Sequence, residues 1–208
     1  MHMKKMLILA MTFVMSCSSV MAQTELNSRV DKTTMKEAKR LRKEGWDVKP
    51  GLLPLEKQLE KSFIMQYEYD EDMNPLYIFG SAMAVGANYD AAKTAAMSLA
   101  ITDLAGHIQT DVTALVENTV ANKELSAGDA TSITETVMTS QSLISQSISR
   151  VITVVECYRI NEKNNNEVQV RVAYKSEMAR AIVRRVVRQQ LEEQGIDLHE
   201  QLDKVLGF

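Results

Sequence analysis

Hydrophobic positions are most regular between residues 76 and 122. The apolar stretch Leu76 to Val85 predicts a short strand, and Gly86-Ala87-Asn88 leads into a long alanine-rich helix that starts near Tyr89. Apolar residues then recur three and four positions apart, which is typical of one buried helical face. They are Met97, Ile101, Leu104, Ala105, Ile108, Val112, Leu115, Val116 and Val120. We expect the rest of the chain to cover this helix.

Small residues dominate the first turns of the same helix and widen its apolar arc. They would let another backbone approach the helix closely. They are Ala91, Ala92, Ala95, Ala96 and Ala100, together with the larger Leu99.

Residues 130–149 predict a return helix antiparallel to the first. Ile133, Val137, Ile144 and Ile148 stand at helical spacing in this stretch. The same twenty residues hold ten serines and threonines, whose side chains compete for backbone hydrogen bonds. We therefore expect a helix that depends on tertiary packing.

A β-hairpin follows the return helix. The β-branched residues from Val151 to Ile160 predict a strand, and the asparagines of residues 161–166 predict a tight turn. The next strand alternates between two sets, which indicates one buried and one solvent-exposed face. The sets are Val168, Val170, Val172 and Tyr174 on one face, and Gln169, Arg171, Ala173 and Lys175 on the other.

The C-terminal part predicts a long helix and a short one. Ser176 stands where the N-cap of the long helix is expected, and Asp197 to Glu200 resembles a capping box for the short one. The inner face of the long helix is expected to hold Met178, Ile182, Val183, Val186 and Val187, and that of the short helix Leu198, Leu202 and Val205. An arginine stripe on the long helix is typical of a solvated face paired with glutamates. It consists of Arg180, Arg184 and Arg188.

The N-terminal part predicts two helices that join the main body. One spans Thr34 to Glu44, with Met35, Ala38 and Leu41 at helical spacing; the other begins near Pro54 and carries Leu55, Leu59 and Phe63. Trp46, the only tryptophan, is expected to fix the extended stretch between them onto the domain.

Together these elements predict an α+β fold, in which a long helical hairpin and further helices pack on a small antiparallel sheet. With 208 residues, 45% of them hydrophobic, the chain is long enough for one sizeable core and short for two. We expect a signal peptide over residues 1–22, a helical extension over 23–70 and an α+β domain over 71–208.

The first 22 residues resemble a bacterial secretory signal. Lys4 and Lys5 precede an apolar core, Met6 to Met15, that is too short to span a membrane. Cleavage after Ala22 would make Gln23 the first residue of the mature chain. The alternative is lipidation at Cys17, because Val14-Met15-Ser16-Cys17 is a passable lipoprotein box; it would leave a flexible polar tether to about residue 31.

Charge and cysteine content narrow the classes of partner. Loss of Lys4 and Lys5 would leave 22 basic residues against 27 acidic ones, a net charge of −5, which favours solubility and argues against nucleic acid. Cys157 would be the only cysteine left if the signal is removed, so no intramolecular disulfide is expected. Its place in a predicted strand favours a buried, unreactive thiol.

The sequence contains no recognisable catalytic, cofactor or metal motif, so we expect neither enzymatic activity nor a cofactor. His199-Glu200 begins like a zinc-protease helix, but Asp203 stands where the second histidine is needed. Asp103, His107 and Asp111 share one helix face because they are four residues apart. We interpret them as a structural ion-pair stripe, with a metal or acid–base site as the alternative.

The small and apolar positions around the central helix resemble those of the LPP-20 family of small bacterial envelope lipoproteins. The resemblance covers about residues 74 to 175. It rests on Gly80-Ser81-Ala82, Asp90-Ala91-Ala92, Ala95-Ala96, Leu99-Ala100, Asp103-Leu104-Ala105, Ile108, Val112 and the following strand hairpin. A similar domain occurs at the N-terminus of a flagellar T-ring protein. The resemblance implies an α+β domain at the outer membrane or cell surface without enzymatic activity; the weak box before Cys17 departs from the family pattern.

These observations predict an exported, non-catalytic envelope protein, in the periplasm or at the outer membrane or cell surface, that acts by binding another envelope protein or copies of itself. The predicted contact face is the nearly uncharged outer face of the return helix, including Thr136 and Thr139. Membrane contact is expected only through a lipid anchor at Cys17. The alternative is a periplasmic small-molecule binding module, with its ligand between the sheet and the alanine-rich start of the central helix.

Overall fold

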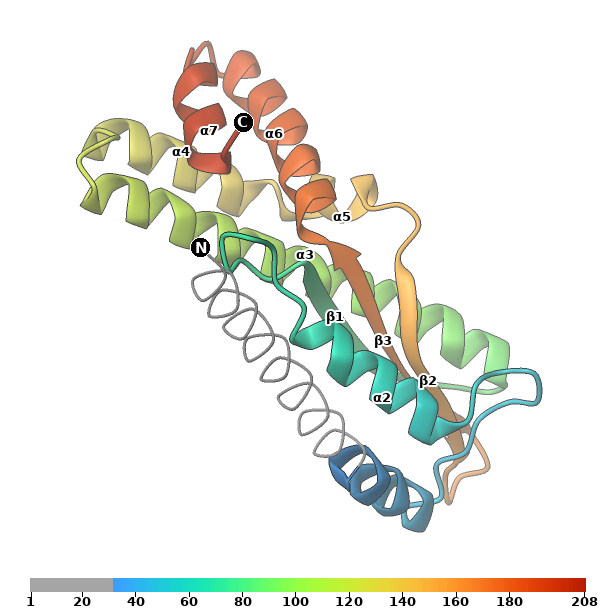
Figure 1. The fold of residues 1–208 in the computed structure, drawn as a ribbon. Helices are drawn as coiled ribbons and strands as arrows, with labels where there is room; N and C mark the ends of the chain where they lie inside the picture. The colour runs from blue at the N-terminus through green and yellow to red at the C-terminus, as the bar shows by residue number, and fades with distance from the viewer. Residues whose placement is uncertain (1–31) are drawn as a thin grey trace, which may run out of the picture.

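The computed structural model describes residues 32–208. Helices pack on both faces of a three-stranded antiparallel sheet (Figure 1), so the predicted α+β class is confirmed. The first element is a helix over residues 32–43, called the N-terminal helix below. It is followed by α2 (Leu55–Gln66), β1 (Tyr77–Gly86), α3 (Tyr89–Ala121), α4 (Ala127–Thr139), α5 (Gln141–Ser147), β2 (Ile152–Ile160), β3 (Asn166–Lys175), α6 (Ser176–Glu193) and α7 (His199–Leu206). Within residues 32–208, no helix combines the length and the apolar character that a bilayer span requires.

The strands are ordered β1-β3-β2, and both neighbouring pairs are antiparallel. One face of the sheet, called the inner face below, packs against α3. On β1 and β3 this face consists of Ile78, Gly80, Ala82 and Ala84 opposite Tyr174, Val172, Val170 and Val168. The prediction that these four β3 residues are buried is confirmed, and the three valines have no exposed surface.

Strand β1 and helix α3 approach each other more closely than ordinary side chains allow. A Cβ added at Gly80 would lie 2.2 Å from the carbonyl oxygen of Ala100, and one at Gly86 would lie 2.5 Å from the backbone nitrogen of Ala92. The predicted close approach is therefore confirmed, and Ala92, Ala96 and Ala100 are fully buried. The predicted width of the apolar arc is wrong, because Ala91, Ala95 and Leu99 are exposed. The contact between β1 and α3 leaves no space between the sheet and the start of α3, so the ligand position expected there is wrong.

The C-terminal half of α3 extends beyond the sheet and is covered by α4, α6 and α7 (Figure 1). The return helix is interrupted at Ser140, where α4 ends and α5 begins, so the prediction of one continuous helix is wrong. The Ser140 hydroxyl is buried and donates to the carbonyl oxygen of Thr136 at 2.7 Å. Such bonds to the preceding turn often bend helices. The four predicted apolar positions are buried: Ile133, Val137, Ile144 and Ile148.

Helix α6 starts differently from the prediction. Lys175 is the residue before its first turn, and the hydroxyl of Ser176 donates to the carbonyl oxygen of Pro75 at 2.6 Å instead of capping the helix. Met178 is 43% exposed, and Ala179 occupies the buried position beside it. The other predicted inner residues are buried, namely Ile182, Val183, Val186 and Val187.

Helix α7 supplies the partner for part of the arginine stripe. Arg184 and Arg188 both donate to the carboxylate of Asp203, so the expectation of glutamate partners is wrong. The predicted capping box is also wrong, because Leu198 is the residue before α7 and no side chain caps it. Leu198, Leu202 and Val205 are buried as predicted.

The N-terminal helix and α2 cover much of the opposite face of the sheet, called the outer face below. Trp46, 5% exposed, packs in a cluster with Ala38, Leu41, Leu55, Leu59, Val155 and Cys157, which confirms its predicted role. The prediction that this face of β3 is solvent-exposed is wrong at Ala173, which is fully buried, whereas Lys175 is exposed and Gln169 and Arg171 are partly exposed. Met35, placed on the buried side from its spacing, is 50% exposed.

Side chains and a short backbone pair protect the free edges of the sheet. Asp47 and Tyr158 exchange two backbone hydrogen bonds of 2.8 Å at the edge of β2, and Gln58 accepts from the Glu156 backbone nitrogen at 2.6 Å. On β1, the Asp103 carboxylate accepts from the Ser81 nitrogen at 2.9 Å. Occupied edge donors disfavour strand-to-strand association.

Candidate functional site

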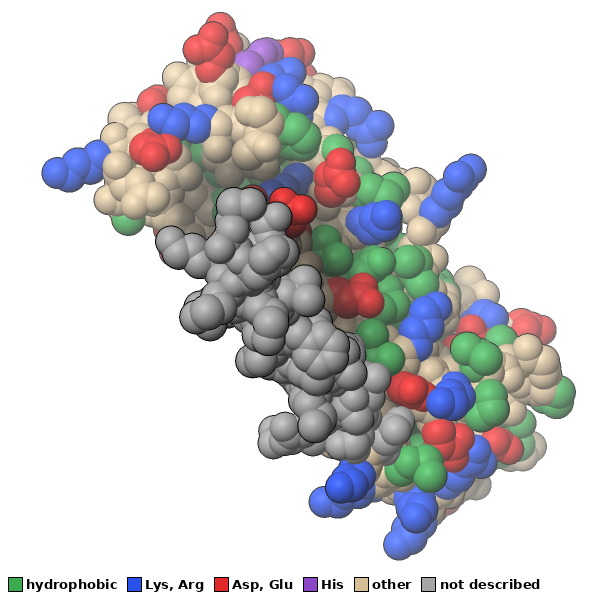
Figure 2. Space-filling view, viewed as in Figure 1, with side chains coloured by type: hydrophobic (Ala, Val, Ile, Leu, Met, Phe, Trp, Pro, Cys, Tyr) green, Lys and Arg blue, Asp and Glu red, His purple; other side chains and the backbone are tan. Residues whose placement is uncertain are grey.

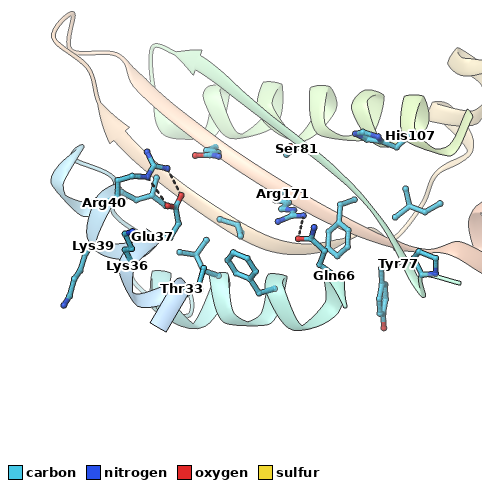
Figure 3. A pocket seen from close by; sticks show the side chains of 18 of the residues that line it. Thr33, Lys36, Glu37, Lys39, Arg40, Gln66, Tyr77, Ser81, His107 and Arg171 are labelled. Atoms are coloured by element: carbon cyan, nitrogen blue, oxygen red, sulfur yellow. Dashed lines mark hydrogen bonds and ion pairs between the residues drawn. The ribbon is translucent and has the colours of Figure 1, made fainter. Parts of the chain in front are cut away.

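A groove, called the sheet groove below, lies between the outer face of the sheet and the two helices that cover it, the N-terminal helix and α2. Its volume is about 1070 Å³, near the upper limit of common ligand sites, roughly 300–1,000 Å³. The N-terminal helix and α2 form one side, β1 and β3 form the floor, and residues of α3 lie at the far end (Figure 3). Its lining includes Thr33, Lys36, Glu37, Lys39, Arg40, Lys43, Phe63, Gln66, Tyr77, Phe79, Ser81, His107, Asp111, Gln169 and Arg171.

Arg171 is the distinctive residue of the sheet groove. It lies on β3, where register places it on the outer face, and its guanidinium carbon is 4.5 Å from the centre of the Phe79 ring. One donor, Nη2, reaches Gln66 Oε1 at 3.2 Å (Figure 3). No aspartate or glutamate among the described residues pairs with Arg171, and burial lowers the pKa of its guanidinium. Since arginine has five N–H donors, most remain for a ligand.

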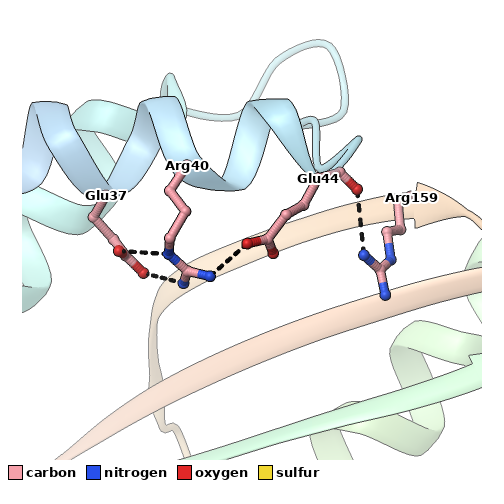
Figure 4. Close-up of polar contacts among 4 residues, drawn as sticks. All are labelled: Glu37, Arg40, Glu44 and Arg159. Carbon is pink, nitrogen blue, oxygen red and sulfur yellow. Dashed lines mark hydrogen bonds and ion pairs between the residues drawn. The ribbon is translucent and has the colours of Figure 1, made fainter.

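The rim of the groove adds positive charge. Five basic residues line it against two acidic ones, in a chain with a net charge of −3. Arg40 is already held between Glu37 and Glu44, with N···O distances of 2.6 Å to each (Figure 4). Among the described residues, Lys36, Lys39 and Lys43 have no carboxylate within ion-pair distance. The unpaired positive charge of the lining is therefore at Arg171 and these three lysines.

The rest of the groove wall is largely apolar. Phe63, Tyr77 and Phe79 are each partly exposed toward it. Figure 2 shows apolar side chains that reach the surface among basic and acidic ones on the face that carries α2. An apolar wall beside the Arg171 guanidinium, which has no carboxylate partner among the described residues, suits a ligand that has both an apolar part and a negative charge.

The predicted stripe of α3 is present and exposed. His107 Nε2 lies 3.6 Å from Asp103 Oδ2, and the same oxygen accepts from the Ser81 backbone nitrogen at the β1 edge. Asp111 stands apart at the groove's end, and burial raises the pKa of its carboxyl. In residues 32–208, no three His, Cys, Asp or Glu side chains are arranged to hold a metal ion. The spacing therefore brings His107 within ion-pair distance of Asp103, whereas no salt bridge joins Asp111 to another described residue.

A buried polar cluster on the inner face was missed by the sequence analysis. Glu156 is only 6% exposed and pairs with Lys93 Nζ at 2.9 Å, while the Tyr89 hydroxyl donates to it. The pKa of Tyr89 is raised by burial and by this hydrogen bond. Lys49 Nζ lies 4.6 Å from the Tyr89 ring centre and 4.5 Å from that of Tyr158. The sequence offered one signal for this cluster: Glu156 is the single acidic residue in a predicted strand rich in β-branched residues.

Comparisons with protein family models, curated proteins and solved structures found no match to this chain.

Other predicted site residues have mixed outcomes. Cys157 is buried as predicted, and burial raises the pKa of its thiol to about 12. Cys17, Ala22 and Gln23, the predicted processing residues, lie outside the described part of the chain. Thr136 is 2% exposed, so its placement on the contact face is wrong. Thr139 is exposed.

Proposed function

We propose that this chain is an exported, non-catalytic envelope protein that acts by binding a small molecule in the sheet groove. Export rests on the signal-like segment Lys4 to Ala22, with either cleavage before Gln23 or lipidation at Cys17. The resemblance to the LPP-20 family favours the same location, at the periplasm or outer membrane, and the same lack of catalysis.

The observation that carries the proposal is Arg171, an arginine on the groove floor without a carboxylate partner among the described residues. Placing a guanidinium in a partly desolvated position is unfavourable unless charge or hydrogen bonds compensate. Gln66 supplies one neutral acceptor and Phe79 a ring face. A ligand would supply the missing acceptors.

Native mass spectrometry of the protein purified from its own cell tests the proposal, together with light scattering at increasing concentration. We expect a monomer that carries a bound small molecule, and a mature N-terminus at Gln23 or an acylated Cys17. A ligand-free oligomer would contradict small-molecule binding, and a retained Met1 would contradict export.

Assembly with an envelope protein or with copies of this chain is the second candidate. It is favoured by exposed apolar side chains on α4, α5 and α3: Met138, Leu143 and Leu99 are 59%, 41% and 51% exposed. No charged residue occurs between Glu135 and Arg150. Replacing Met138 and Leu143 with lysine would dissociate an oligomer that is held together by these side chains. Thr131→Lys is the control, because Thr131 is exposed on α4 between Asp129 and Glu135; this variant should leave the oligomer intact.

A catalytic role of the α3 stripe is tested by replacing Asp103, His107 and Asp111 together with alanine. We expect a cellular phenotype equal to that of the parent and a stability change of about 1 kcal/mol, because surface contacts contribute little. Loss of the phenotype in a folded variant would support the acid–base or metal alternative.

A further inference from the structure

We infer that the ligand of the sheet groove is an amphipathic organic anion, a single hydrocarbon chain ending in a carboxylate or a phosphate, whose head group binds Arg171. The inference rests on the proposed function and names the class of ligand for the same site.

The head group follows from the geometry of Arg171. Its guanidinium carbon lies over the Phe79 ring and Nη2 donates to Gln66, so four of the five N–H donors, on Nε, Nη1 and Nη2, remain for a ligand. Two parallel N–H donors of a guanidinium bind two oxygens of a carboxylate or a phosphate at once. A ligand with a single neutral acceptor would use only one of these donors. A bound anion would also offset the cost of partly burying the Arg171 charge.

The charge of the lining residues favours an anion over a cation in the groove; Lys36 and Lys39 lie at one end, His107 at the other, and Arg171 between them (Figure 3). Lys36 and Lys43 project from the N-terminal helix without a carboxylate partner among the described residues, and both line the groove. Of the two acidic lining residues, Glu37 is neutralised by Arg40. The other, Asp111, lies on α3 with His107 and would repel an anionic head there. The charges therefore favour a head group at Arg171 or toward the lysines rather than at the α3 end of the groove.

The hydrocarbon chain follows from the walls. Phe63, Tyr77 and Phe79 present partly exposed rings, whereas a site for a small polar anion would be lined mainly by donors. Burial of a chain against such rings contributes roughly 0.8 kcal/mol per CH₂ group. The site is thus suited to a ligand with both a long apolar part and one negative group.

Isothermal titration of the purified mature protein tests the inference with four twelve-carbon probes, each below its micelle concentration: dodecanoate, dodecyl phosphate, dodecyltrimethylammonium and dodecyl maltoside. We expect the two anions to bind and to raise the melting temperature, and the cationic and neutral probes to bind at least tenfold more weakly. The tighter of the two anions identifies the head group.

Three variants assign the binding to this site. Arg171→Gln is expected to weaken dodecanoate binding by about 10- to 100-fold, the usual effect of losing charged hydrogen bonds. Arg185→Gln is the control, because Arg185 is exposed on α6 and lies outside the groove; binding should stay within about twofold. Lys36→Glu changes an exposed residue, so it keeps the test valid if Arg171→Gln fails to fold; we expect a several-fold loss.

The outcomes separate the inference from the proposed function. If the cationic or neutral probe binds as tightly as dodecanoate, or if Arg171→Gln and Lys36→Glu both bind like the parent, the anionic ligand is wrong while a binding groove stands. If no probe binds and the protein from its own cell carries no small molecule, both are wrong.

Discussion

Replacing Gly80 with alanine tests the contact on which the fold depends. The added methyl group would lie 2.2 Å from the Ala100 carbonyl oxygen and 2.6 Å from both the backbone nitrogen and the Cβ of Leu104. Two of these three atoms belong to the backbone of α3, a helix of 33 residues, so no side-chain rotation relieves the clash. To reach even 3.0 Å from the oxygen, strand and helix must separate by roughly 0.8 Å.

Overpacking of this kind typically costs about 1–3 kcal/mol, and we expect the upper end because the obstacle is backbone. For a chain of this size each kcal/mol lowers the melting temperature by roughly 2–4 °C, so the midpoint should fall by about 6–12 °C. Thermal unfolding followed by circular dichroism measures this change.

Gly128→Ala is the matched control for this substitution. Gly128 lies in the first turn of α4, and a Cβ there would meet only the Ser126 hydroxyl at 3.9 Å. Because alanine is the better helix former, this variant should be unchanged or more stable by up to about 1 kcal/mol. If Gly80→Ala melts within about 1 °C of the parent, the close contact between β1 and α3 is not what holds the sheet.

Three further predictions concern other parts of the structure. Val170→Asp places a carboxylate at a fully buried position and should unfold the protein, at a cost of several kcal/mol; a melting curve like that of the parent would show that the inner face is wrongly assigned. Hydrogen bonds from Arg184 hold the pKa of Asp203 below its ordinary 3.8, so this carboxylate stabilises the folded state above about pH 4 and loses that effect as the pH falls toward its folded-state pKa. Asp203→Asn should therefore lower stability at pH 7, with a difference from the parent that shrinks below pH 4 in urea titrations. Cys157, with a thiol pKa of about 12, should resist alkylation at pH 8 in the folded protein and react in urea, as peptide mass mapping would reveal.

Local spacing predicted the elements of the described chain well. The strands, the turn at residues 161–166 and the central helix all lie where apolar periodicity and asparagine content placed them. Periodicity succeeds because a helix or strand that buries one face must repeat its apolar residues at 3.6 or 2 positions.

Caps and helix breaks were predicted less well, because several residues compete for the same role. Ser176 has the right chemistry for an N-cap, but its hydroxyl is used by the carbonyl of Pro75, a residue about one hundred positions away. Ser140 follows the last residue of α4 and donates to Thr136, but Thr131, Ser132 and Thr136 make the same kind of bond inside the helix, so side-chain chemistry alone did not mark the break.

The sheet groove depends on how distant segments meet. Arg171 alternates with buried valines, which by itself predicts only that it faces away from α3. Its environment comes from Gln66 on α2, Phe79 on β1 and the lysines of the N-terminal helix, which are separated from it by 92 or more positions in the sequence. An arginine without a carboxylate partner can be identified only from the distances between its guanidinium and the surrounding carboxylates, which the sequence does not give.

The sequence by itself determined the type of each element, the buried face of α3 and the alternation of β3, because these depend on neighbours within one or two turns of chain. Only the tertiary structure decided which elements cover the outer face, that Ala173 is buried beneath them, and that Arg171 lies in a groove without a carboxylate. The reason is physical: burial and ion pairing depend on distances between atoms, and for residues far apart in the chain those distances follow from the packing of whole elements rather than from sequence spacing.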